Sequence, residues 1–519
     1  MALRKFPMPP ATKDLFLAID VGTGSVRAAL IDVEGQIAGF HAAEHDQQVP
    51  QFGWSQQRPS DWWNGVILCI RSVLEKVESA STRIAAVACC GQMHGTVLLD
   101  ESGVPVVDYA PLWNDKRTRG VLDEFLQRHD QEKLLPITGN PAATAWPAFK
   151  LLWFKHDLPA VYQRARSVLI VKDFINFKLT NNKAIDHPEA STTYLYDVGT
   201  NSWSTSIIDL LELNPNLLPE LKSPIDIVGT ISKQCSEQTG LLSGTPVAVG
   251  AGDFPVTLLG SGVSPVGVGS DSTGTSTLLT LQTEKPVLHP IISNVAGIDQ
   301  GWSAFTILDA GGDAMRWARR AFHDNELSYD ELVKLAGAVA PGSDGLLFLP
   351  YLNGERLGPR TNARAQFFGL TYGHQTGHLH RAVMEGVAFA SRRNLSIMEE
   401  SGNTLNYMIA SGGGAKTRLW LEIKASIYRT PIRTTKHSES SILGCAMIAG
   451  TAAGIYPSLA AASKRLIQLD EEIVPNPDWV PRYEKLAALF DEIYRAAGPY
   501  YEKLDQYAAE FGAAAANTG

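Results

Sequence analysis

Two short apolar segments, each followed by a loop of glycine and hydroxyl residues, constrain the fold of this chain more than any other feature. The first segment, residues 15–20, leads into the loop residues Gly22, Thr23, Gly24 and Ser25. The second lies in the latter half of the chain and leads into Gly274, Thr275 and Ser276. A strand pattern resumes after each loop, so each passage predicts a β-hairpin. Two such hairpins predict an internal duplication.

The length of 519 residues exceeds the usual size of one domain, so at least two cores are expected. A segment rich in Gly, Ser and Pro at 259–265 predicts a boundary between domains at 1–260 and 261–519. Strand-like runs are found at 84–90, 168–171 and 245–249. They alternate with helical segments such as 60–77, and this alternation predicts α/β layers.

Composition excludes several classes of protein. The chain has 45 Lys and Arg against 54 Asp and Glu, a net charge of -9, and this acidic balance gives no support to a nucleic-acid surface. The five cysteines form no CxxC pair, so we expect small buried residues in a reducing cytosol. The N-terminus lacks the apolar core of a signal peptide. The apolar stretch 441–462 is interrupted by glycines and Pro457, which predicts a buried helix in a cytoplasmic protein and no membrane span.

Asp20 ends the first apolar segment beside Gly22 and Thr23. Glycines allow backbone N–H groups to approach phosphate oxygens, and hydroxyls add donors. A carboxylate in such a loop would repel phosphate unless a cation lies between them, so Asp20 is a candidate magnesium ligand acting through water. A plain hairpin turn explains the same residues, since Gly, Thr, Asp and Ser dominate turns.

Asp253 follows another apolar strand pattern and has glycines before it. An acid at a strand end is well placed to act as a general base. The alternative is a helix N-cap, which Asp also favours.

A third glycine-rich turn contains Gly412, Gly413 and Gly414 between an apolar run and a helical pattern. Consecutive glycines would let a flat ligand such as adenine lie against bare backbone, and tight packing of a strand on a helix is the alternative. Together with Gly274 and Thr275, these residues are the candidate nucleotide contacts in the second half.

Polar residues follow two further strand patterns. Gln92, Met93 and His94 come after the apolar run that ends in Cys90, and Trp113 follows a second run. These side chains could bind the hydroxyls and the apolar face of a sugar, although a lone His is more often structural. GxxxxGK[ST], a complete GxGxxG opening a helix, HExxH and GxSxG are all absent, which excludes a Walker loop and weakens dinucleotide, zinc-protease and serine-hydrolase interpretations.

The chain resembles the FGGY carbohydrate kinases, within the actin-like ATPase group, over nearly its whole length. The segment 365–370 followed by 378–385 matches one of the family's signature patterns. A second signature is approximate: residues 147–153 fit, whereas Ala145 and His156 depart from it. Within the family, residues 91–95 and 112–115 look most like those of xylulokinases.

The resemblance implies two actin-like, ribonuclease-H-like ATPase domains with a cleft between them. It implies that domain 1–260 binds the sugar and supplies the base, and that domain 261–519 binds the nucleotide. Asp253 would accept a proton and Asp20 would act at the metal and phosphates, with both carboxylates near Mg²⁺. Met93 and His94 would bind the sugar. Phe254 departs from the xylulokinase pattern, in which Asn follows the catalytic Asp.

We therefore predict an ATP- and Mg²⁺-dependent kinase that converts D-xylulose to D-xylulose 5-phosphate. Ribulose, gluconate, alditol and autoinducer-type kinases are the alternatives within the enzyme class. An actin-like chaperone or filament protein and a catalytically weak sugar sensor are the alternatives outside it. The expected partners are the sugar and ATP, with neither nucleic acid nor membrane, and a homodimer is left open.

Overall fold

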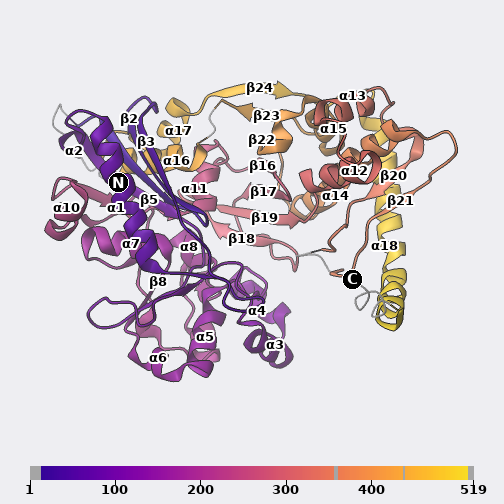
Figure 1. Ribbon diagram of the computed structural model, residues 1–519. Helices are drawn as coiled ribbons and strands as arrows, with labels where there is room; N and C mark the ends of the chain where they lie inside the picture. The colour runs from indigo at the N-terminus through magenta and orange to yellow at the C-terminus, as the bar shows by residue number, and fades with distance from the viewer. Residues whose placement is uncertain (1–12, 356–359, 437–438, 512–519) are drawn as a thin grey trace.

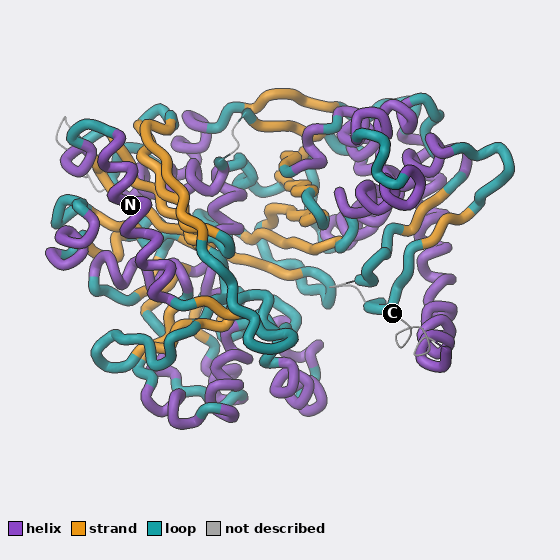
Figure 2. The backbone as a smooth tube through the Cα atoms, viewed as in Figure 1, coloured by secondary structure: helices purple, strands orange, loops and turns teal. Residues whose placement is uncertain are grey.

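The computed structural model describes residues 13–355, 360–436 and 439–511. Two large β-sheets lie beside each other, and helices cover their outer faces (Figures 1 and 2). The predicted α/β architecture is confirmed. The prediction about a signal peptide concerns residues 1–10, which lie outside the described residues.

The first sheet has the strand order β13-β14-β5-β1-β2-β3, and β15 pairs with β5 beyond the end of β14. Its strands are β1 (Leu15–Val21), β2 (Ser25–Asp32), β3 (Ile37–Glu44), β5 (Ile84–Gly91), β13 (Ile227–Thr230), β14 (Pro246–Ala248) and β15 (Ala251–Gly252). Strands β1 and β2 form the predicted hairpin, and β1 runs parallel to β5.

The second sheet has the order β18-β19-β17-β16-β22-β23-β24. Its strands are β16 (Val268–Thr273), β17 (Thr277–Thr283), β18 (Ser293–Ala296), β19 (Trp302–Leu308), β22 (Tyr407–Ser411), β23 (Ile432–Thr435) and β24 (Leu469–Ile473). The run β19-β17-β16-β22-β23-β24 reproduces β3-β2-β1-β5-β14-β13, including which neighbours are parallel. The predicted duplication is present in the topology.

Strand β1 shows why the first sheet lies between two layers. All seven of its residues are buried, as expected for a strand covered on both faces. Leu15, Leu17 and Ile19 pack with α1 (Pro59–Lys76) and α7 (Val171–Thr180). Phe16 and Ala18 pack on the other face.

The helices on that other face are α11 (Asp253–Gly260) and α16 (Ser440–Ala452). Helix α16 belongs to the second half of the sequence, so the two halves interlock across the expected boundary. The helices cross closely, because a Cβ on Gly260 would lie 1.8 Å from the Ser440 carbonyl oxygen and one on Gly444 would lie 2.2 Å from that of Val256.

The helices of the second half surround its sheet. They include α12 (Gly312–His323), α14 (Thr376–Glu400), α15 (Arg418–Tyr428) and α18 (Val480–Phe511). A smaller helical region, in the lower part of Figure 1, contains α3 (Arg119–Arg128), α4 (Gln131–Thr138), α5 (Pro147–Asp157) and α6 (Pro159–Arg164). Helix α9 (Thr205–Leu210) shares its core, and α8 (His187–Ser191) lies against β18. The core of this region is rich in aromatic side chains such as Trp146, Phe149 and Tyr194.

Two further predictions are confirmed. All five cysteines fall within the described residues and are free and buried. The 441–462 stretch contains the buried helix α16, which ends before Pro457. No helix in the described part of the chain has the length and apolarity needed to cross a bilayer.

Candidate active site

Strand β5 brings the two candidate carboxylates to one edge of the first sheet. Asp20 pairs with Cys90 from one side of β5, and Ala251 pairs with Cys90 from the other. Asp253 follows Ala251 by two residues, so Asp20 and Asp253 flank the end of β5. Carboxyl ends of parallel strands are the usual ligand-binding edge of α/β sheets.

One oxygen of Asp20 is engaged and the other is not. Its Oδ2 accepts hydrogen bonds from Arg27 and from Ser441 Oγ, the latter at 2.7 Å. Its Oδ1 is buried and has no hydrogen-bond partner among the described residues. A buried carboxylate oxygen without a donor is costly, and a hydrated cation would satisfy it. Asp20 therefore fits the predicted metal position.

Asp253 is the first residue of helix α11, and Gly252 occupies the cap position without a side-chain cap hydrogen bond. The N-cap interpretation of Asp253 is therefore wrong by one residue, because α11 begins at Asp253 directly after β15 ends at Gly252. Burial, and then the negative charge of Asp20, raise the pKa of Asp253 to about 7. A carboxylate with this pKa is matched to proton abstraction near neutral pH.

Gln92 joins the first loop to its neighbours. Its amide oxygen accepts from Thr23 Oγ1 at 3.2 Å, and its amide nitrogen donates to Gln57 Oε1 at 2.7 Å. Trp113 Nε1 donates to the same Thr23 hydroxyl at 3.1 Å. The side chains of Gln92 and Trp113 thus hold Thr23 in place. Trp113 is 42% exposed, so its side chain remains available for stacking.

Met93 lies directly against the segment that carries Asp253. A Cβ on Gly252 would lie 2.5 Å from Met93 Cγ and 2.8 Å from Glu189 Oε2. Only glycine allows this approach, which brings the thioether and a second buried carboxyl group next to the candidate base.

His94 is held by its backbone. It adopts the left-handed φ of 67°, its N–H donates to Glu189 Oε1 at 2.9 Å, and its carbonyl accepts from Lys150 Nζ at 2.6 Å. Burial lowers the pKa of its imidazole well below the usual value, so the ring is neutral at pH 7. The ring packs edge-to-face on Trp146, with 4.9 Å between centroids.

Sequence reasoning missed Lys150 and Glu189 as parts of this site. Lys150 was noted only as part of segment 147–153, which fits a family signature, and Glu189 was not noted. Burial lowers the pKa of Lys150 to about 7 and raises that of Glu189 well above its usual value. A lysine inside the apolar run 148–154 was the available signal, since a charge there requires a partner.

We predict that Lys150→Met raises the KM for sugar about tenfold, the effect of losing one well-made hydrogen bond, while the KM for ATP stays within about twofold. The His94 backbone would lose the hydrogen bond from Lys150 but keep the one to Glu189. Thr96 Oγ1 would still donate to the His94 carbonyl at 3.0 Å. The melting temperature should therefore change little, since the substitution also removes a buried ammonium group.

Steady-state kinetics with each substrate varied, together with thermal unfolding, test this prediction. Lys155→Met on the same helix is the matched control, because Lys155 pairs with the exposed Glu212 at 3.2 Å. An unchanged KM for sugar in Lys150→Met would contradict the role given to Lys150.

The candidate nucleotide loops meet at the carboxyl ends of β16 and β22, where Ser272 pairs with Ser411. A Cβ on Gly274 or Gly413 would meet no atom of the described residues within 4 Å, so the backbone is open at both positions. A Cβ on Gly414 would lie 2.7 Å from Thr273 Cβ. Tight packing, the alternative interpretation, therefore accounts for Gly414.

A glycine pair that sequence reasoning missed completes this region. The Gly312 N–H donates to the Gly274 carbonyl at 2.8 Å, and the Asp313 N–H donates to that of Thr275 at 3.1 Å. A Cβ on Gly311 would lie 2.8 Å from the Ser276 carbonyl carbon. A Gly-Gly pair before a helical pattern was the available signal. It sets the start of α12 against the Gly274 loop.

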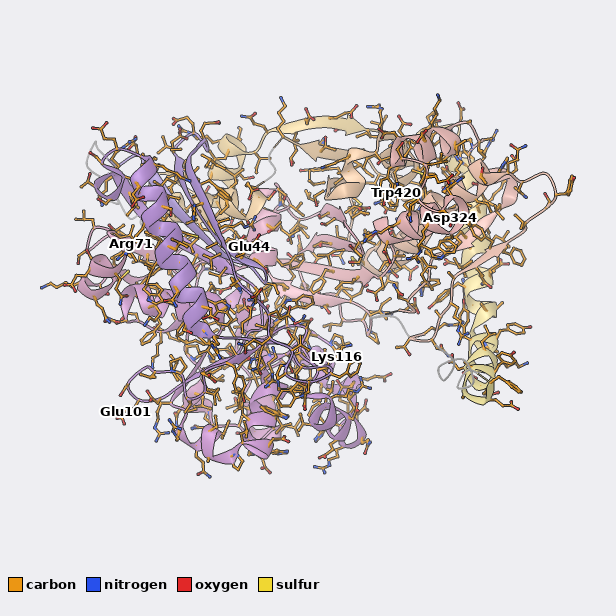
Figure 3. The ribbon with its side chains drawn as sticks, in the orientation of Figure 1. Glu44, Arg71, Glu101, Lys116, Asp324 and Trp420 are labelled. Atoms are coloured by element: carbon orange, nitrogen blue, oxygen red, sulfur yellow. The ribbon has the colours of Figure 1, made fainter. Side chains whose placement is uncertain are left out.

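A buried ion pair, Lys424 with Asp271, stabilises the start of the Gly274 loop. Lys424 Nζ donates to Asp271 Oδ1 at 2.7 Å and to Thr273 Oγ1 at 2.6 Å, and Tyr428 donates to Asp271 Oδ2 at 2.8 Å. The Lys424 ammonium also lies 4.8 Å from the ring centroid of Trp420, which is labelled within the helical layer in Figure 3. These contacts fix Thr273, the residue before Gly274.

Comparisons with known proteins find relatives over nearly the whole length of the chain. Residues 15–260 match the family model for the N-terminal domain of the FGGY family of carbohydrate kinases, and residues 270–453 match that for its C-terminal domain. The chain is 31% identical to a xylulose kinase of Lactococcus lactis, covering 95% of this chain and 98% of that protein. It is 31% identical to an autoinducer-2 kinase of Salmonella paratyphi A, covering 92% and 94%. The crystal structure of xylulose kinase from Rhodospirillum rubrum aligns with a TM-score of 0.88 at 25% identity, covering 94% of this chain and 100% of that one.

Proposed function

The chain belongs to the FGGY family of carbohydrate kinases, and from this premise we propose that it transfers the γ-phosphoryl group of ATP to a primary hydroxyl of D-xylulose. The product would be D-xylulose 5-phosphate. The observation that carries the proposal is the placement of Asp253 beside Asp20 and against Met93. The chain is a carbohydrate kinase with the two-domain, actin-like ATPase fold of its relatives, as predicted.

Asp253 accepts the proton of the attacking hydroxyl in this proposal. A general base contributes about 10²–10⁴-fold to the rate, and positioning contributes much of the rest. Met93, His94 and Trp113 hold the sugar beside Asp253. The loops containing Gly22 and Thr23 and containing Gly274, Thr275 and Gly413 hold the phosphates in line with that hydroxyl.

Family members use ATP, typically with a divalent metal, and we propose Mg²⁺ for this chain. The unpartnered Oδ1 of Asp20 supports this assignment, with Asp253 as the second carboxylate near the ion. When bound, Mg²⁺ offsets negative charge on the phosphates. Arg27 and Ser441 keep the Asp20 carboxylate oriented toward that position.

The identity of the sugar depends on the residues around Asp253. The xylulose kinase relatives favour D-xylulose as the substrate. An autoinducer-2 kinase is also 31% identical to this chain, so an autoinducer-type substrate is an alternative. Ribulose, gluconate and alditols are further alternatives. Phe254, the departure from the xylulokinase pattern, packs edge-to-face on Phe305 with 5.0 Å between centroids. This contact joins the first turn of α11 to β19 in the second half.

The division of labour between the halves is part of the same proposal. Domain 1–260 supplies the sugar site and the base, and domain 261–519 supplies the nucleotide loops, with the substrates held between them. Closure would exclude water as a competing acceptor. We also propose a cytoplasmic location. The filament, chaperone and sensor alternatives are disfavoured by membership in a carbohydrate kinase family.

A coupled ADP-release screen across pentuloses, hexuloses, alditols and aldonates tests the proposal. We expect the highest kcat/KM with D-xylulose. A higher kcat/KM with an aldonate, an alditol or a linear autoinducer-type ketose would show that D-xylulose is the wrong substrate, while phosphoryl transfer to a sugar would still stand. ADP release that no sugar stimulates would contradict the proposed function.

A further inference from the structure

The edge strand β18 of the second sheet is docked on the first half of the chain. It pairs on one side with β19 and also lies against helix α8, next to the lower part of the molecule in Figure 1. All four residues of β18 are buried. Backbone N–H and C=O groups at a buried sheet edge need partners, so the residues that supply them hold the two halves together.

The side-chain amide of Asn140 takes the place of a neighbouring strand at this edge. Its Oδ1 accepts from the Asn294 backbone N–H at 2.7 Å, and its Nδ2 donates to the Asn294 carbonyl at 2.9 Å. The Asn294 side chain returns the contact, because its Nδ2 donates to the Gly139 carbonyl at 2.6 Å. Both asparagines are at most 1% exposed. A buried amide is costly when unpaired, so this reciprocal pair fixes the two halves at one point.

A further set of contacts ties β18 to helix α8. The Ala296 N–H donates to Ser191 Oγ at 2.9 Å, and Asn140 Nδ2 also donates to the Ser191 carbonyl at 3.1 Å. Ala190 of the same helix belongs to one apolar cluster with Ala296 and Trp302 of the second half. Ser191 is the last residue of α8, so the second half holds this helix at its C-terminal end.

Helix α8 also carries Glu189, which contacts the proposed sugar site. Glu189 Oε1 accepts from the His94 N–H at 2.9 Å, and its Oε2 lies beside Gly252, the residue before Asp253. A helix of five residues has little stability of its own, so its position depends on its neighbours. A shift of α8 would therefore move Glu189 away from His94, whose left-handed backbone needs such support.

We infer that Asn140 and Asn294 are positioning residues for the sugar site, so that the half with the proposed nucleotide loops also holds the sugar loop in place. They act through α8, Glu189 and His94 rather than by contact with the sugar. Strand β18 belongs to the same sheet as β16 and β17, which flank the Gly274 loop, so one sheet joins the two substrate sites. That the ligand is a sugar rests on the proposed function, whereas the contacts among these residues do not.

Steady-state kinetics on Asn294→Ala and Asn140→Ala, with sugar and ATP each varied, test this role. We expect each variant to raise the KM for sugar about tenfold and to leave the KM for ATP within about twofold, although Asn294 lies in the second half. The double variant should resemble either single variant, because both substitutions break the same reciprocal pair. Ser191→Ala removes a single hydrogen-bonding group and should raise the KM for sugar about threefold, which keeps the test open if an asparagine variant does not fold.

Ser303→Ala is the matched control. Ser303 lies on the neighbouring strand β19, and its Oγ accepts from Gln282 Nε2 at 2.8 Å within the second sheet. This substitution also removes a buried hydrogen bond from the second sheet, but it leaves the contacts with α8 in place. The KM for sugar should therefore stay within about twofold of the wild type, and thermal unfolding shows whether each variant is folded.

Hydrogen exchange of the ligand-free protein tests the same contacts without any substrate. Asn294→Ala should speed exchange in peptides covering 91–95 and 187–193 and leave residues 272–276 unchanged. Unchanged exchange at 91–95 in a folded variant would overturn the inference, as would equal rises in the KM for sugar and for ATP. A wild-type chain whose ADP release no sugar stimulates would contradict the proposed function instead, and hydrogen exchange would then decide the positioning role alone.

Discussion

Asp253→Asn is expected to lower kcat for sugar phosphorylation by about 10²–10⁴-fold, with ATP binding unchanged. The substitution keeps the size and polarity of the side chain and removes its ability to accept a proton. Asp253 is the first residue of α11 and is not one of the residues proposed to contact the nucleotide, so those contacts should be preserved.

The protonation of Asp253 adds a pH dependence to this prediction. Its pKa is raised to about 7, and only the deprotonated form is a base, so kcat/KM should fall as the pH drops through that value. A bound cation favours the ionised form and moves the fall to lower pH. The kcat/KM of Asp253→Asn should not show this fall at low pH.

The free energy of unfolding should depend on pH in the opposite sense to kcat/KM, and should fall as the pH rises. An acid with a folded pKa above its unfolded value of about 4 binds more protons in the folded state. The folded state is therefore destabilised as the pH rises from about 4 to about 7, and this cost persists at higher pH. Asp253→Asn removes it, so the ligand-free variant should melt above the wild type at pH 8. A variant that keeps near wild-type turnover would remove Asp253 from its role.

Asp20→Ala is expected to lower kcat at saturating sugar by at least about 10²-fold, because Asp20 acts on the metal and phosphates rather than on the sugar. It is also expected to raise the Mg²⁺ concentration required for half-maximal rate. The buried Oδ1 without a hydrogen-bond partner among the described residues is the structural reason.

Steady-state kinetics at saturating sugar, with Mg²⁺ and ATP each varied, measure this effect. Asp14→Ala is the matched control, since Asp14 lies just before β1 and pairs with Arg83 at 2.7 Å on the surface. If Asp20→Ala changed only the KM for sugar, the metal and phosphate assignment would be wrong.

Local patterns predicted the elements that surround the site. Helix α1 was expected at 60–77 and is found at Pro59–Lys76, because its apolar periodicity and Pro59 mark it clearly. The hairpin of β1 and β2 followed from two apolar runs around a glycine-rich turn. Both depend on residues that are close in sequence.

Contacts between distant segments could not be predicted in this way. Asp20 and Asp253 come together only because β1 and β15 both pair with β5. The hydrogen bonds that fix the His94 backbone come from Lys150 and Glu189, on two separate helices. Periodicity gives no information about such pairings, so the sequence suggested the residue types of the site but not their supports.

Residues after the predicted boundary at 260/261 also contact the first sheet, so dividing the sequence at one point does not separate the two halves of the site. Ser441, on α16, donates to Asp20, and Arg27 links Asp20 to Glu439 at 2.9 Å. A residue pattern along 441–462 indicated a buried helix but not the sheet on which it packs. The candidate metal position is therefore built from both halves of the chain.

The most direct test of sugar phosphorylation is to follow ADP release and the ³¹P spectrum of the products together, with and without D-xylulose. The proposed function predicts that ADP release depends on the sugar and that one phosphate ester on its primary hydroxyl forms for each ADP. Release of inorganic phosphate at a rate that D-xylulose and the other sugars leave unchanged would contradict it.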